Sequence, residues 1–126
     1  SSGSPTVSGP FGGTEMSGRA VGEIVVDPAN AANIFVTTAS GIGGIGCGFG
    51  TLFPSRGLFR STNATGVTPT FTKLTVTGAG EDRDMVDLAI DPANGNRLLV
   101  SVIGTAVQSG IWLSTTALGA ATFTRH

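Results

Sequence analysis

The sequence is poor in the side chains on which most catalytic and metal sites depend. Among its 126 residues there is no tyrosine, one cysteine (Cys47), one tryptophan (Trp112) and one histidine (His126). A single cysteine cannot form an internal disulfide. Because the one histidine is the last residue, the sequence argues against a Ser-His-Asp arrangement and against a histidine-containing metal cluster. We therefore expect no cofactor and no metal.

Charge and long hydrophobic runs are scarce as well. Charged residues make up 12% of the chain and the formal net charge is −1, so no electrostatic field favours nucleic acid or an anionic membrane. The longest apolar runs, such as residues 98–100, are far too short to span a bilayer. Residues 1–4 include no initiator methionine and nothing that resembles a signal peptide. We expect a chain that begins at a processed end or is part of a longer protein.

Glycine, serine and threonine are abundant instead. The twenty glycines indicate short strands joined by tight turns, and a hydrophobic content of 40% argues against disorder. A composition rich in these residues and poor in cysteine is common in secreted bacterial β-proteins. We therefore expect a secreted, extracellular all-β protein.

Four segments recur in the same order, so the chain contains two copies of one repeat. The matched segments are residues 24–30 (IVVDPAN) with 88–94 (LAIDPAN), 33–37 (NIFVT) with 97–101 (RLLVS), 57–62 (GLFRST) with 110–115 (GIWLST), and 70–73 (TFTK) with 122–125 (TFTR). Each copy predicts four short strands, which in the first copy fall at residues 24–26, 34–38, 57–62 and 71–76. Asp27 and Pro28 predict the turn after the first strand.

The repeat resembles the Asp-box, or bacterial neuraminidase, repeat of sialidases, xyloglucan hydrolases, sortilin-like receptors and plant-type photosystem assembly factors. The resemblance rests on Val-Asp-Pro-Ala-Asn, Gly-Leu-Phe-Arg-Ser-Thr-Asn and Thr-Phe-Thr-Lys-Leu, and it covers roughly residues 21–126. It implies β-propeller blades. The sequence departs from the family at its signature, because the usual aspartate is replaced by Asn63 in the first copy and Thr116 in the second.

The resemblance implies two four-stranded antiparallel blades. We expect an N-terminal segment at residues 1–20, which includes an outer strand of a preceding blade near residues 6–11. Blade one is expected at 21–79, with a long loop at 41–56, and blade two at 80–126. Propellers close with about four to eight blades, so we expect the chain to be part of a larger propeller or one of several copies in an assembled one. The expected partners are other blades, in the same longer chain or in neighbouring copies.

Two loops are expected to share the face that binds ligands in such propellers. The first is the long loop, which exceeds its counterpart by about eleven residues and contains Phe49, Phe53 and Arg56. It is either a surface or packing loop or part of a ligand pocket. The second is the acidic stretch Glu81-Asp82-Arg83-Asp84. Its carboxylates suit Ca²⁺ or an acid–base pair, or they form a solvated charged loop in which Arg83 neutralises its neighbours.

Glu23 and Asp87 occupy equivalent positions near the start of the innermost strands. They either ring the mouth of a central channel or end a buried strand. Trp112 aligns with Phe59, which predicts packing and not sugar binding. The sequence Asn63-Ala64-Thr65 is an N-glycosylation sequon if the protein passes through a eukaryotic secretory pathway.

Function follows less directly than fold. Sialidases depend on a tyrosine nucleophile, and this sequence has no tyrosine. We expect a non-catalytic extracellular module that acts as a scaffold or as a protein- or glycan-binding surface, with self-assembly among its possible modes. One alternative is a fragment of a glycoside hydrolase with catalytic carboxylates on the propeller face. A further alternative is an assembly or chaperone factor.

Overall fold

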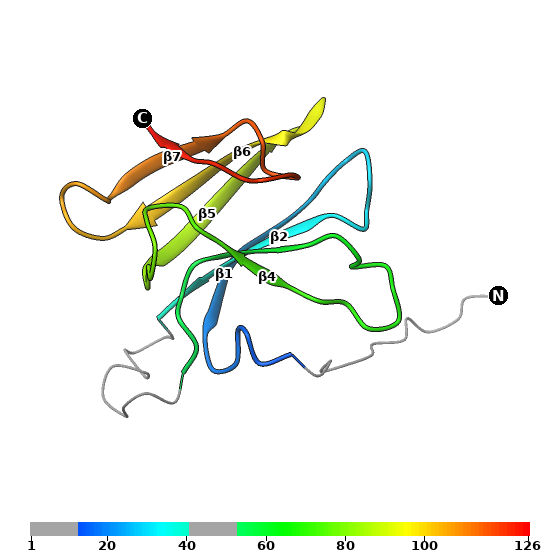
Figure 1. The fold of residues 1–126 in the computed structure, drawn as a ribbon, viewed down its shortest axis with the longest axis horizontal. Helices are drawn as coiled ribbons and strands as arrows, with labels where there is room; N and C mark the ends of the chain where they lie inside the picture. The colour runs from blue at the N-terminus through cyan, green and yellow to red at the C-terminus, as the bar shows by residue number, and fades with distance from the viewer. Residues whose placement is uncertain (1–12, 41–52) are drawn as a thin grey trace.

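The computed structural model describes residues 13–40 and 53–126, and these residues form strands and turns without a helix. The first sheet contains β1 (Ala20–Val26), β2 (Ile34–Ala39), β3 (Leu58–Ser61) and β4 (Thr72–Leu74). The second sheet contains β5 (Asp84–Asp91), β6 (Asn94–Ile103), β7 (Gly110–Ser114) and β8 (Thr124–Arg125). Within each sheet, every strand pairs antiparallel with the next along the chain (Figure 1). The predicted all-β fold with two four-stranded antiparallel sheets is confirmed. Among the described residues, no helix is long and apolar enough to cross a membrane.

Two strand boundaries differ from the prediction. β1 begins at Ala20, because it continues past a bulge in which Gly22 and Glu23 lie opposite Thr37. A bulge interrupts the alternation of side chains, so the hydrophobic pattern does not reveal the part of the strand before it. β4 ends at Leu74, since its partner strand β3 has no residue beyond Leu58 with which to continue the ladder.

The turns after β1 and β5 have the predicted chemistry. The Ala29 amide donates a hydrogen bond to the Asp27 carboxylate at 3.0 Å, and the Ala93 amide donates to Asp91 at 2.8 Å. In both copies the aspartate therefore bonds the backbone two residues further on, as the Asp-Pro-Ala-Asn sequence predicts.

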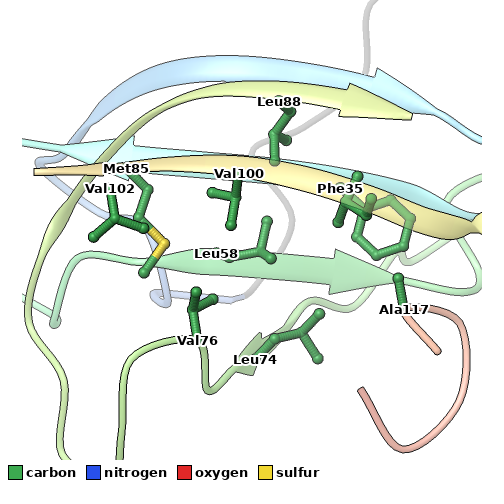
Figure 2. Packing of buried hydrophobic residues seen from close by; sticks show 10 residues of the cluster. Phe35, Leu58, Leu74, Val76, Met85, Leu88, Val100, Val102 and Ala117 are labelled. Atoms are coloured by element: carbon green, nitrogen blue, oxygen red, sulfur yellow. The ribbon is translucent and has the colours of Figure 1, made fainter. Parts of the chain in front are cut away.

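The hydrophobic core lies between the two sheets (Figure 2). The first sheet and the segment after it contribute Phe35, Leu58, Leu74 and Val76, while the second sheet and its last turn contribute Met85, Leu88, Leu98, Val100, Val102 and Ala117. Along β6 the buried residues alternate with exposed or half-buried ones, as in a strand with one face against a core. Burial of these side chains is the main stabilising contribution that the structure shows.

The first strands of the two sheets, β1 and β5, differ in the face that they bury. Val21, Ile24 and Val26 of β1 are 51%, 55% and 45% exposed. Their counterparts in β5 are Met85, which is fully buried, Leu88, which is 7% exposed, and Ile90, which packs against the core. We call the face that carries these positions the back face. It is buried in the second sheet, while its β1 residues are exposed in the first.

The opposite face, which we call the front face, shows the reverse pattern. Phe35 and Leu58 of the first sheet are fully buried. Their counterparts in the second sheet, Leu99 and Ile111, are 39% and 44% exposed. The front face of the first sheet thus packs on the back face of the second. The two sheets are therefore stacked front to back, and they do not pack with equivalent faces toward each other.

The backbones of β1 and β5 lie close together at Gly22. A Cβ atom at this position would lie 2.9 Å from the Met85 carbonyl oxygen and 3.1 Å from the Val86 Cα atom. Backbone atoms cannot move aside as the end of a flexible side chain can, so any side chain at residue 22 would push the sheets apart. Its counterpart in the second sheet is Val86, where no further sheet lies against the strand.

Candidate functional site

Most of the residues predicted as a site meet at one end of the molecule. We call this the loop end, and it consists of residues 53–57, 75–83 and 104–109 with the strand ends beside them. The structure brings Arg56, which precedes β3, against Asp82 and Asp84 at the start of the second sheet. The two loops that the propeller resemblance placed on one face therefore do contact each other.

Arg56 is the centre of this cluster. Its Nε atom donates to Asp82 Oδ1 at 2.9 Å, and its backbone amide donates to the same oxygen at 2.7 Å. Its Nη1 atom donates to Asp84 Oδ1 at 3.1 Å and to Ser40 Oγ at 2.7 Å. The Ser40 amide in turn donates to Asp84 Oδ1 at 2.6 Å. The cluster thus joins the end of β2, the start of β3 and the start of β5.

These contacts shift the ionisation of both partners. Hydrogen bonds from Arg56 lower the pKa of the Asp82 carboxyl below its ordinary value, and the hydrogen bond to Asp82 raises the pKa of Arg56. Both groups are therefore held in their charged forms. A carboxylate with a lowered pKa is a poor general acid at neutral pH, which needs a raised pKa to retain its proton.

The Glu81 carboxylate is not part of the Arg56 cluster and hydrogen-bonds to backbone amides instead. It is buried, and its carboxylate accepts hydrogen bonds from the Val76 amide at 2.9 Å and from the Thr77 amide at 2.6 Å. The Lys73 ammonium donates to the Glu81 carbonyl oxygen and to Ser55 Oγ, and partial burial lowers the pKa of Lys73. Glu81 therefore closes the turn that follows β4.

Arg83 does not have the role that its sequence neighbours suggest. The guanidinium that pairs with Asp82 and Asp84 is that of Arg56, 26 residues before Asp82 along the chain. The Nε atom of Arg83 is buried without a hydrogen-bond partner among the residues that the structure describes, and its side chain lies beside Gly104. Proximity in sequence suggested the wrong arginine, because Arg83, just before β5, extends its side chain toward Gly104 in the β6–β7 connection.

Phe53 packs on the same end of the molecule. The Arg19 guanidinium lies over the Phe53 ring, 5.5 Å from its centroid, and donates a hydrogen bond to the Pro54 carbonyl oxygen at 2.8 Å. This arrangement fits a packing role for Phe53. Phe49 and the rest of residues 41–52 lie outside the described residues, as does the outer strand predicted near residues 6–11.

Glu23 and Asp87 lie in equivalent bulges, one in each sheet. The Glu23 amide donates to Thr37 Oγ1 at 2.9 Å, and Asp87 accepts a hydrogen bond from the neighbouring Leu88 amide at 3.0 Å. Asp87 is exposed and lines a shallow hollow of about 220 Å³ on the front face of the second sheet. The structure therefore shows the predicted equivalence of the two carboxylates, which are on neighbouring innermost strands.

Asn63 and Thr116, which occupy aligned positions in the two copies, make equivalent hydrogen bonds. Asn63 Oδ1 accepts from the Thr70 amide at 2.9 Å, and Thr116 Oγ1 accepts from the Thr122 amide at 3.2 Å. Each oxygen closes the connection between the third and fourth strands of its sheet. Trp112 packs against the core and donates from Nε1 to the Gln108 carbonyl oxygen at 2.9 Å, which confirms its predicted packing role.

The chemistry available at the loop end is structural. Asp82, Asp84 and Glu81 use their carboxylates on Arg56 or on backbone amides. Within residues 13–40 and 53–126, no three His, Cys, Asp or Glu side chains lie together in an arrangement suited to a metal ion. The partnership of Arg56 with these aspartates and the role of Ser40 were missed from the sequence, because each contact joins residues at least 16 positions apart along the chain. No family model, curated protein or solved structure matches the chain.

Proposed function

We propose that the chain is a pair of β-propeller blades of the Asp-box type and acts as a secreted, non-catalytic scaffold with a protein- or glycan-binding surface. The observation that carries this proposal is the front-to-back stack of the two sheets. In a propeller each blade packs one face on the opposite face of the next, so every blade has the same relation to its neighbour. The hydrogen bonds of Asn63 and Thr116 support the Asp-box assignment, since both close the turn at the signature position.

The loop end supports a scaffold over a hydrolase. A glycosidase needs two carboxyl groups that flank a bound sugar, one of them with a raised pKa. Asp82 instead has a lowered pKa because Arg56 binds it, and Asp84 binds the same guanidinium. Secretion is proposed from the composition, which is rich in threonine, serine and glycine and has one cysteine.

The test compares binding with turnover on the same samples. The chain, and any longer protein that contains it, would be incubated with a panel of soluble polysaccharides, while reducing ends and binding are measured in parallel. We expect no release of reducing ends. We also expect Asp82→Asn, Asp84→Asn and Asp87→Asn to leave any binding within about twofold of the unchanged chain, which is a difference of about 0.4 kcal/mol.

Asp91→Asn is the matched control, because Asp91 lies in a turn and not at the loop end. Release of reducing ends that is lost in Asp82→Asn or Asp84→Asn, but kept in Asp91→Asn, would contradict the scaffold and establish a hydrolase.

A further inference from the structure

Both halves of the sheet–sheet interface are present a second time on the surface of the chain. The back face of β1 exposes Val21, Ile24 and Val26, and the front face of the second sheet exposes Leu99 and Ile111. The counterparts of all these residues are in or against the core. Val36 and Phe59, which lie on the same face as Ile24, are buried, so within the first sheet it is β1 that presents this face. We call Val21, Ile24 and Val26 the donor face, and the front face of the second sheet around Leu99 and Ile111 the acceptor face. Each chain therefore exposes one donor face and one acceptor face of a contact that it already makes internally.

The internal interface shows how the acceptor face would be covered. β5 packs against both β1 and β2, so the contact centres on the innermost strands of the two sheets. The exposed back-face residues lie on β1, the counterpart of β5. The exposed front-face residues Ala89 and Leu99 lie on β5 and β6, the counterparts of β1 and β2. The strands that would meet in a contact between two copies are thus strands that carry exposed apolar residues.

The surface of the acceptor face also fits an incoming sheet of this repeat. A hollow lined by Ala89, Leu99, Ser101 and Ile111 lies on it, and a second hollow, lined by Asp91, Arg97 and Leu113, lies beside it. In the first sheet the position equivalent to Asp91 is Asp27, which is buried against Gly95 of the second sheet. The position equivalent to Leu113 is Arg60, which donates to the carbonyl oxygens of Ala117 and Gly119 across the interface.

We propose that copies of this chain associate front to back, with β1 of one copy on the front face of the second sheet of another. This inference rests on the proposed scaffold function and names the partner as a second copy. Because donor and acceptor faces differ, the contact is heterologous and adds copies around an axis or along a line. A propeller of about four to eight blades corresponds to about two to four copies, so the expected product is a closed ring.

The test uses native mass spectrometry and sedimentation velocity on the whole chain. The unchanged chain should form species that are multiples of 12.6 kDa. Ile24→Lys removes the donor face and Leu99→Lys removes the acceptor face, so each variant alone should lose the ring and run at 12.6 kDa. Val67→Lys and Val107→Lys are matched controls, since these valines are 90% and 74% exposed in turns, and they should assemble normally.

A mixture of the Ile24→Lys and Leu99→Lys variants tests the front-to-back contact specifically. An Ile24→Lys chain keeps its acceptor face and a Leu99→Lys chain keeps its donor face, so an equimolar mixture should form a species of two chains and nothing larger. Val26→Lys and Ile111→Lys serve as a second pair if either first variant fails to fold, as judged by its circular dichroism.

Three results would overturn the proposal. An unchanged chain that stays at 12.6 kDa would point to a further repeat in a longer polypeptide as the occupant. A dimer that survives Ile24→Lys would show that the front face binds itself. A mixture that forms no two-chain species would exclude the front-to-back contact. None of these results measures polysaccharide cleavage. The proposal that the protein is non-catalytic is tested separately, by the release of reducing ends.

Discussion

At the scale of single residues, Asn63 and Thr116 perform the same task at aligned positions of the two copies. Asn63 Oδ1 accepts hydrogen bonds from both the amide and the hydroxyl of Thr70, and Thr116 Oγ1 accepts from the Thr122 amide. An amide oxygen and a hydroxyl oxygen can each accept such a bond. The two turns therefore keep the same closing hydrogen bond with different side chains.

This equivalence predicts how the turn responds to mutation. Asn63→Ala removes the acceptor of three hydrogen bonds and should lower the free energy of unfolding by at least about 1 kcal/mol, which is typical for the loss of a single one. Asn63→Asp keeps an acceptor at the same place and should change the free energy of unfolding by less than about 0.5 kcal/mol. Urea unfolding of the three proteins measures both values. An Asn63→Ala variant as stable as the unchanged chain would show that the oxygen does not support the turn.

The acidic stretch shows the limit of prediction at this scale. Residues 81–84 were identified from the sequence as a cluster of charge, and they do lie at the predicted end of the molecule. Their partners were not identified, because Arg56 reaches Asp82 only after the chain has passed through two further strands. Contacts of this kind depend on the register between loops, which local sequence does not contain.

At the scale of elements, the repeat predicts which residues form strands but not which of their faces is covered. The strands and the Asp-Pro turns followed from periodicity and turn chemistry, and the pairing of four antiparallel strands in each copy followed from the family resemblance. The strand before each bulge did not, since Gly22 and Glu23 interrupt the alternation in β1. Burial also differs between equivalent residues such as Leu58 and Ile111, because the neighbour of a sheet lies outside its own sequence.

Leu58 and Ile111 therefore make a matched pair. In chains that carry Ile24→Lys, so that copies cannot dock, Leu58→Ala should lower the free energy of unfolding by about 2–5 kcal/mol, because it leaves a cavity in the core. Ile111→Ala at the equivalent position should lower it by less than about 1 kcal/mol, since its side chain is 44% exposed. Chemical denaturation measures the two differences. Equal losses would contradict the assignment of front and back faces.

At the scale of the whole molecule, two copies of one repeat form a stack with unlike ends. The core lies between the front of one sheet and the back of the other (Figure 2). Residues of the same two faces are exposed on β1 and on the second sheet. Exposed aliphatic faces of this kind mark surfaces that associate. The proposed scaffold function and the proposed front-to-back association both depend on this arrangement of the sheets.

A disulfide across the sheets tests that arrangement most directly. A Cβ atom at Gly95 would lie 2.6 Å from the Asp27 Cγ atom, so residues 27 and 95 face each other across the two sheets, as the partners of a disulfide must. Asp27→Cys and Gly95→Cys would be combined in a chain with Cys47→Ser, oxidised at low concentration, and mapped by mass spectrometry of its peptides. The front-to-back stack predicts an intramolecular disulfide between residues 27 and 95 in the folded monomer, and the single variants provide the unlinked controls. A folded double variant in which both thiols remain free would contradict it.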